Sequence, residues 1–221
     1  MRPLPALYAV LWVAACLGFA VLAAFAAAND TFPADVWLTH RLQDVHSAAF
    51  ADVLNWTEDM AQVPAIAFIT LAAALGALYA GGRGPAVLVA ATLIARPLNS
   101  VIKEIVERPR PSAELVRVHD QPSDFSFPSG HAHNALLLYG LLFYLAAVYV
   151  PAAWVRLPLQ ALCLWLIIGN GLERVYAGDH WPSDVLGGFY IGALLLAALI
   201  AVHRLVIAPR RGVTGGAAGR S

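Results

Sequence analysis

Six apolar stretches alternate with polar connections along the chain. They cover residues 6–28, 63–80, 85–102, 132–150, 152–171 and 185–207. A helix crosses a bilayer with about 20 mostly apolar residues, so each stretch is long enough to span it. The third reaches that length only if its helix continues past Arg96 towards Lys103. The stretches lack the period-two alternation of membrane barrel strands. The pattern predicts an all-α polytopic membrane protein with six transmembrane helices in one bundle.

The two ends of the chain carry their own signals. Arg2 precedes the first apolar stretch and small alanines follow it, as in a signal peptide. The stretch is longer than the apolar core of such a peptide, which favours a retained anchor. We expect residues 1–211 to form one six-span membrane domain whose functional site lies on the outer face. The Gly/Ala-rich residues 212–221 are predicted to be a disordered cytoplasmic tail.

The connection between the first two spans is amphipathic. Residues 36–60 mix large apolar side chains, among them Trp37, Leu42, Phe50 and Trp56, with charged ones at near-helical spacing. This predicts one amphipathic helix that lies at the membrane interface between the first and second spans. A lid or packing element without a specific ligand is the simpler interpretation of the same pattern.

Composition supports the membrane assignment. Hydrophobic residues make up 60% of the 221 residues and charged residues 13%, about half the usual ~25%. So few charges do not cover the surface of a soluble domain. The 14 basic and 14 acidic residues cancel, which argues against a nucleic-acid partner. Cys16 and Cys163 both lie in apolar stretches and form neither a disulfide framework nor a metal motif.

The basic residues are distributed unequally between the two sides of the predicted bundle. One side carries no acidic residue and the following arginines: Arg2, Arg83, Arg156, Arg204, Arg210, Arg211 and Arg220. The positive-inside rule places this side, with both termini, in the cytoplasm. Arginine outnumbers lysine and alanine is abundant, a bias typical of a GC-rich bacterium. We therefore expect an inner-membrane protein whose long outer segments face the periplasm.

The first of three polar segments on the outer side runs from Lys103 to Pro111. Arg110 follows Lys103 by about two helical turns, so both cations share a helix face until Pro109 disrupts the helix. Juxtamembrane charges that snorkel to lipid headgroups would produce the same spacing. Lys103 is the single lysine of a chain with thirteen arginines. This bias indicates that the position requires the compact charge of an ammonium group rather than the planar fork of a guanidinium.

The second segment, Pro128-Ser129-Gly130-His131, opens the fourth span. Ser129 is placed as an N-cap, and Gly130 lets backbone amides approach a ligand closely. A helix N-terminus with free amides binds anions. A plain capped helix start, with His131 at the interface, is the structural alternative.

The third segment leads into the sixth span. His180 and Asp184 are four residues apart, a spacing at which a carboxylate fixes the tautomer of an imidazole and leaves its other nitrogen free to react. Arg174 supplies a bidentate clamp for phosphate. A loop histidine satisfied by a neighbouring acid is the alternative. Taken together, the three segments provide the cations, nucleophile and acid that phosphoryl transfer needs.

The spacings Lys103-x6-Arg110-Pro111, Pro128-Ser129-Gly130-His131 and Arg174-x5-His180-x3-Asp184 resemble the three motifs of the type-2 phosphatidic acid phosphatase superfamily, in its membrane lipid phosphatase branch. The resemblance implies that His180 is a nucleophile that forms a phosphohistidine, that Asp184 orients it and that His131 is the general acid. It implies neither a metal ion nor a cofactor. The implied phosphate-binding residues are Lys103, Arg110, Ser129, Gly130 and Arg174.

Two residues depart from this pattern or add to it. The family usually carries serine immediately before the motif arginine, where this chain has Glu173. An ionised carboxylate there would repel phosphate unless it pairs with Arg174 or Lys103, points away or is protonated. Arg96 lies near mid-membrane, and we expect it to bond carbonyls or Asn99 beside Pro97 rather than the substrate.

The resemblance implies hydrolysis of a lipid phosphate or diphosphate, such as undecaprenyl diphosphate, phosphatidylglycerol phosphate, phosphatidic acid or lipid A, at the outer leaflet. Its partners would be that substrate and membrane lipids. Two alternatives stay open: a lipid phosphotransferase, in which a hydroxyl replaces water on the phosphohistidine, and a non-catalytic lipid-binding protein. Vanadate haloperoxidases share such a site but are soluble.

Overall fold

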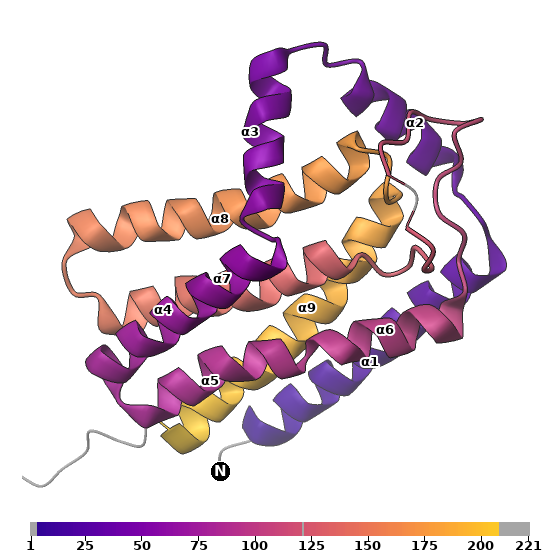
Figure 1. Cartoon of the computed structure of the whole chain (residues 1–221). Coiled ribbons are helices and arrows are strands. Elements are labelled where there is room, and N and C mark those ends of the chain that lie inside the picture. Colours follow the sequence, from indigo (N-terminus) through magenta and orange to yellow (C-terminus); the bar gives the residue numbers. More distant parts are fainter. Residues whose placement is uncertain (1–3, 121, 208–221) are drawn as a thin grey trace, which may run out of the picture.

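The computed structural model describes residues 4–120 and 122–207, and the regular elements in this part of the chain are all helical (Figure 1). They are, in chain order, α1 (Leu4–Ala28), α2 (Pro33–Gln43), α3 (Ala48–Asp59), α4 (Val63–Gly81), α5 (Arg83–Ile94), α6 (Arg96–Val106), α7 (Gly130–Tyr149), α8 (Ala153–Tyr176), α9 (Pro182–Val202) and the short π-helix η1 (His203–Ile207). The predicted tail, residues 212–221, lies outside the described residues.

Within the described residues, six spans are long and apolar enough to cross a membrane, which confirms the predicted fold class. They are Leu7–Ala28, Pro64–Gly81, Arg83–Val106, Gly130–Tyr149, Ala153–Tyr176 and Pro182–Ile207. The outward faces of these helices are apolar, with Tyr79, Ile94 and Leu205 each more than three-quarters exposed. Such exposure suits contact with lipid rather than with water.

The third span combines α5 and α6, as its predicted continuation towards Lys103 requires. The two helices meet at Ala95, and Pro97 is the second residue of α6. Since Pro97 has no N–H to donate to the preceding turn, the regular helix is interrupted there. The side chain of Arg96 is outside the described part of the structure, so its environment stays a prediction. Asn99, proposed as its partner, donates to the carbonyl of Pro128 at 3.2 Å.

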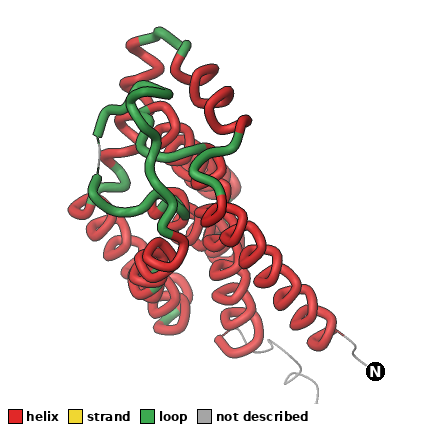
Figure 2. Tube along the Cα trace, turned by 90° about the vertical axis from the view of Figure 1, so that its right-hand side faces the viewer, coloured by secondary structure: helices red, strands yellow, loops and turns green. Residues whose placement is uncertain are grey.

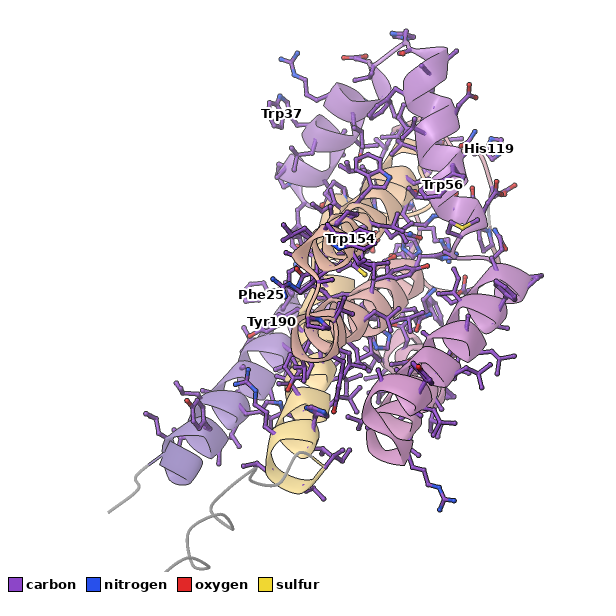
Figure 3. The ribbon with its side chains drawn as sticks, turned by 90° about the vertical axis from the view of Figure 1, so that its left-hand side faces the viewer. Phe25, Trp37, Trp56, His119, Trp154 and Tyr190 are labelled. Carbon is purple, nitrogen blue, oxygen red and sulfur yellow. The ribbon has the colours of Figure 1, made fainter. Side chains whose placement is uncertain are left out.

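The prediction of a single amphipathic helix between the first two spans is wrong, because two helices, α2 and α3, occupy this connection. Ser47 has extended backbone angles (φ −127°, ψ 118°) and caps α3 by accepting the N–H of Phe50 at 3.3 Å. The Ser47 side chain competes with the backbone for the hydrogen bonds of a continuous helix, so α2 ends before it and α3 begins after it. Trp37 on α2 projects outward, at the same end of the molecule as Trp56 of α3 (Figure 3).

The α7 helix is the centre of the bundle and packs against α8 and α9. Its buried side chains, including Leu138, Tyr139 and Leu141, form the main core with residues of α5 and α8. Gly188 on α9 permits this close packing, since a Cβ there would lie 2.4 Å from the carbonyl oxygen of Ser129. On the other side of α9, α1 packs through Phe19, whose ring lies 5.8 Å from that of Tyr190.

The polar segments lie at one end of this bundle. The α4–α5 and α7–α8 turns lie at the opposite end from α2 and the loop that joins α6 to α7 (Figure 1). Figure 2 shows the long connections gathered above the spans. The loop 107–129 is held against the turn after α8, because His119 donates its N–H to the carbonyl of Ala177 at 2.8 Å. Gly178 is required in that turn: its φ is 79° and a Cβ would meet the carbonyl oxygen of Arg117.

Candidate active site

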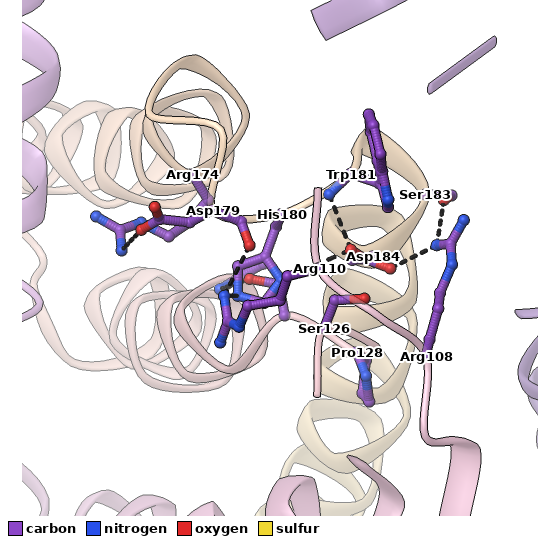
Figure 4. Close-up of polar contacts among 12 residues, drawn as sticks. Arg108, Arg110, Ser126, Pro128, Arg174, Asp179, His180, Trp181, Ser183 and Asp184 are labelled. Carbon is purple, nitrogen blue, oxygen red and sulfur yellow. Dashed lines mark hydrogen bonds and ion pairs between the residues drawn. The ribbon is translucent and has the colours of Figure 1, made fainter. Parts of the chain in front are cut away.

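His180 and Asp184 form a buried pair at the entrance to α9, as their spacing predicts (Figure 4). The turn after α8 carries His180, which is 3% exposed, and Asp184 is fully buried in the first turn of α9. The Nδ1 atom of His180 lies 3.7 Å from Oδ2 of Asp184, just beyond hydrogen-bond distance. That Oδ2 also accepts the backbone N–H of Trp181 at 2.8 Å. The carboxylate is thus fixed beside the ring by the start of its own helix.

The opposite edge of the His180 ring faces Arg110. The guanidinium Nη1 of Arg110 lies 3.4 Å from Nε2 of His180 and donates to the carbonyl of Asp179 at 2.7 Å. Burial, opposed by Asp184 and assisted by the charges of Arg110 and Lys103, lowers the pKa of His180 to about 4. The imidazole is therefore neutral near pH 7, and Nε2 presents its lone pair on the cationic side.

Lys103 and Arg110 meet at a carboxylate that the sequence analysis did not single out. Lys103 Nζ lies 2.5 Å from Oδ2 of Asp124, and Arg110 Nη2 lies 2.6 Å from Oδ1. They do not share a helix face, contrary to the prediction, since α6 ends at Val106 and Glu107 takes a left-handed conformation (φ 51°) before Pro109 is reached. The loop brings the two cations together instead, and the bridging Asp124 carboxylate marks an anion site between them.

The N-terminus of α7 adjoins this pair. Ser129 is the N-cap, as predicted, and its hydroxyl accepts the N–H of Ala132 at 3.5 Å. The N–H of Ser129 donates to the carbonyl of Asp184 at 2.9 Å, which links the second motif to the third. A Cβ on Gly130 would lie 3.2 Å from the side-chain amide nitrogen of Asn99, so a larger residue there would press against α6.

His131 is the second residue of α7 and is half-buried. It lines a pocket of about 170 Å³ together with Gln62 and with Asn134 and Tyr139 of α7. Tyr139 also lines a larger apolar groove of about 470 Å³, which is formed by α4, α7 and α8. A small pocket of mixed polar and apolar lining at His131 therefore borders an apolar groove within the membrane-spanning part.

Arg174 points into a cluster of acids rather than towards His180 (Figure 4). It is bonded to Glu173, to Glu58 of α3 at 2.7 Å and to Asp179 at 2.8 Å. Burial raises the pKa of Asp179, and Arg174 and Arg110 oppose that shift. Of the alternatives for Glu173, the structure favours pairing with Arg174. The structure thus unites His180, Asp184, Lys103 and Arg110, whereas Arg174 is engaged by three carboxylates.

Reasoning from the sequence missed two contributors to the site, Asp124 and Arg108. Asp124 lies in the loop before the second motif, and nothing in its neighbours marks it as the partner of both cations. Arg108 precedes Arg110 by two residues and donates to Oδ1 of Asp184 at 2.5 Å. The alternation Arg-Pro-Arg-Pro was a signal that could have drawn attention to Arg108. Among residues 4–120 and 122–207, no three His, Cys, Asp or Glu side chains gather as metal ligands would.

The fold and the site define a polytopic helical membrane protein with a buried histidine–carboxylate pair facing an anion site. The sequence profile of the PAP2 superfamily matches residues 84–207, more than half of the chain. The chain therefore belongs to the PAP2 superfamily, which confirms the resemblance drawn from its motifs.

Relatives and solved structures agree with this membership. The chain is 41% identical over 105 residues to phosphatidylglycerophosphatase B of Bacillus subtilis, covering 45% of this chain and 48% of that protein. It is 33% identical over 114 residues to decaprenylphosphoryl-5-phosphoribose phosphatase of Mycobacterium tuberculosis, and this match covers 51% of this chain and 58% of that protein. These matches span about half the length of the relatives. The crystal structure of a transmembrane PAP2-type phosphatidylglycerolphosphate phosphatase from Bacillus subtilis superposes with a TM-score of 0.77 at 25% identity, over 90% of this chain and 98% of that one.

Proposed function

We propose that the protein is a membrane lipid phosphatase that hydrolyses a lipid phosphate or diphosphate at the outer membrane face. One observation carries the proposal: the His180 ring lies between a carboxylate, Asp184, and a guanidinium, Arg110, with Lys103 on the same cationic side. A neutral, oriented imidazole beside fixed positive charge is what attack on a phosphate requires. The relatives named above, which are phosphatases of lipid phosphates, support the same reaction class.

The proposed reaction has two steps. His180 Nε2 attacks phosphorus, the bond to the lipid oxygen breaks, and His131 gives its proton to that leaving oxygen. Water then attacks the phosphohistidine, His131 takes a proton from that water, and inorganic phosphate leaves as the bond to Nε2 breaks. Asp184 faces Nδ1 in both steps and stabilises the proton there by its negative charge.

The proposed phosphate ligands are Lys103 and Arg110, with Ser129 and the amide of Gly130 at the N-terminus of α7. Arg174 belongs to the family motif, and in this proposal it joins them only by exchanging one of its acidic partners for phosphate. Because these cations already balance the phosphoryl charge, the proposed reaction needs no metal ion.

The lipid part of the substrate is proposed to lie in the apolar groove of α4, α7 and α8, which borders the pocket at His131. A lipid tail in this groove would stay within the bilayer, and only the headgroup of the lipid would leave it. The proposed orientation puts both termini in the cytoplasm and the site at the periplasmic face of a bacterial inner membrane. Its basis is that the α4–α5 and α7–α8 turns lie at the end opposite the site (Figure 1), since α5 begins at Arg83 and Arg156 lies in the first turn of α8.

A panel of purified lipid phosphates tests the proposal. Phosphatidylglycerol phosphate, phosphatidic acid, undecaprenyl diphosphate and lipid A are each incubated with detergent-purified protein, and released inorganic phosphate is measured. We expect phosphate release from at least one of them without any added acceptor. Release only when a lipid or sugar alcohol is present would identify a phosphotransferase instead, and no release in either condition would contradict the proposed enzyme.

A further inference from the structure

Arg108 is the most enclosed cation of the site. Its side chain is 0% exposed and lies between two carboxylates, Asp184 of α9 at 2.5 Å and Asp35 of α2 at 2.9 Å. Burying an arginine is costly unless its charge is compensated and its donors are bonded. The placement of Arg108 therefore depends on both acids. These acids come from distant parts of the chain, since Asp35 and Ser183, the residue before Asp184, are separated by 148 residues.

Every nitrogen of the Arg108 guanidinium has a partner. Nη1 donates to the hydroxyl of Ser183 at 2.7 Å as well as to Asp184, and Nε faces the carbonyls of Asn29 and Asp30 at 3.2 Å. Asp35 completes a closed network, since it accepts both the backbone N–H and the hydroxyl of Ser183. The network ties α2 to the first turn of α9, directly behind the histidine pair.

Asp184 is held by this network on the side away from His180 (Figure 4). Its Oδ1 accepts from Arg108, while its Oδ2 accepts the N–H of Trp181 and faces His180. Loss of Arg108 would leave Oδ1 buried without that donor, so the carboxylate would rotate or move. Loss of the charge would also strengthen the attraction of Asp184 for a proton on His180.

We propose that Arg108, fixed by Asp35, is a positioning residue for the His180–Asp184 pair, and that α2 is part of the catalytic architecture through this contact. Arg108 fixes the orientation of Asp184 and limits how strongly that carboxylate holds a proton on the imidazole. The inference rests on the proposed function, because it assigns a role to residues that act behind the nucleophile.

The charges that act on His180 come from three elements: Asp184 from α9, Arg110 from the loop 107–129 and Lys103 from α6. Arg108 acts through Asp184. Arg108→Gln therefore favours the protonated imidazole and moves the acid limb of kcat/KM to higher pH. Asp35→Asn leaves the Arg108 charge less compensated and moves that limb to lower pH. A role confined to folding gives no such pair of opposite shifts.

The experiment compares pH profiles of kcat and KM for wild type, Arg108→Gln, Arg108→Lys and Asp35→Asn on one lipid phosphate. Arg117→Gln is the matched control, since it removes a charge from the same loop where the arginine bonds Gln43 instead of Asp184. Asp52→Asn on the exposed face of α3 is the control for Asp35→Asn. Detergent gel filtration and thermal unfolding check that each variant folds.

We expect Arg108→Gln to lower kcat by about 100-fold, the cost of a misplaced catalytic group, with little change in KM. Its acid limb should move up by about half a pH unit, and that of Asp35→Asn should move down. Arg108→Lys keeps the charge but not the geometry, so kcat should fall while the limb stays. A folded Arg108→Gln variant that matches Arg117→Gln in kcat and in its pH profile would overturn the inference, and so would shifts of the same sign for Arg108→Gln and Asp35→Asn.

A readout without turnover separates this inference from the proposed function. Orthovanadate binding to the detergent-purified protein is followed by isothermal titration calorimetry as a function of pH. An inactive wild type would contradict the proposed function, yet opposite pH shifts in vanadate binding for Arg108→Gln and Asp35→Asn would still support the positioning role. Identical vanadate profiles in all variants would refute it.

Discussion

Asp124 occupies the position between Lys103 and Arg110 where a substrate phosphate is proposed to bind, so its removal should strengthen phosphate binding. Burial opposes ionisation of this carboxyl, but hydrogen bonds from Lys103 and Arg110 outweigh it and lower the pKa of Asp124 to about 2. The side chain is therefore charged at every practical assay pH, and a phosphate must displace it or share the two cations with it.

The free energy by which Asp124 competes with phosphate follows from the exposed fractions of the three side chains. The Asp124 side chain is 48% exposed, whereas those of Lys103 and Arg110 are 9% and 12% exposed. A half-exposed ion pair contributes at most about 1 kcal/mol after solvent screening, so the two pairs together contribute about 1–2 kcal/mol. That free energy corresponds to about a 5- to 30-fold change in affinity.

The assay measures inhibition by inorganic phosphate and KM for one lipid phosphate in Asp124→Ala and Asp124→Asn. The inhibition constant and KM should both fall by about 5- to 30-fold in Asp124→Ala, and less in Asp124→Asn, whose amide oxygen still accepts. Glu114→Gln, which removes an exposed carboxylate from the same loop, is the control and should behave as wild type. An unchanged or weaker inhibition by phosphate in Asp124→Ala would refute the assignment of this position as the phosphate site.

Three further predictions follow from the site and its orientation. Activity should survive EDTA and be inhibited by vanadate, since Lys103 and Arg110 supply the positive charge; loss on chelation that magnesium restores would contradict the mechanism. Glu173 is bonded to Arg174, and if this contact is its only contribution, Glu173→Gln should lower kcat/KM only modestly and Glu173→Ser should stay active. Losses of about 100-fold in both variants, about 2.7 kcal/mol of barrier, would reveal a direct catalytic role. In a background without Cys16 and Cys163, an impermeant thiol reagent applied to intact cells should label Ala113→Cys but not Ala153→Cys, and labelling of the latter would reverse the proposed orientation.

The sequence predicted the membrane architecture well because the bilayer imposes a length and an apolar composition that single stretches reveal. The Ser129 cap and the His180–Asp184 pair were also predictable, since both depend on residues close together in the chain. The break between α2 and α3 was not predictable, because the apolar pattern of a helix continues across Ser47 and hides the cap that this residue forms. The contacts of Arg108 with Asp35, and of Asp124 with both Lys103 and Arg110, arise from packing between distant segments, and no spacing in the sequence encodes them.

The separate roles of the two histidines are the most direct test of the central claim. His180 is proposed to attack phosphorus, so its loss abolishes turnover of every substrate. His131 is proposed to protonate the leaving oxygen, help worth about 10²- to 10⁴-fold when the leaving group is an alkoxide. A nitrophenolate leaves without a proton, so the same variant should retain much of its activity on a nitrophenyl ester.

The measurement is kcat/KM of His131→Ala and His180→Ala on a lipid monophosphate and on p-nitrophenyl phosphate, with folding checked by detergent gel filtration. We expect His131→Ala to be severely impaired on the lipid and largely rescued on p-nitrophenyl phosphate, and His180→Ala to be inactive on both. Equal losses for His131→Ala on the two substrates, or turnover by His180→Ala on either, would contradict it.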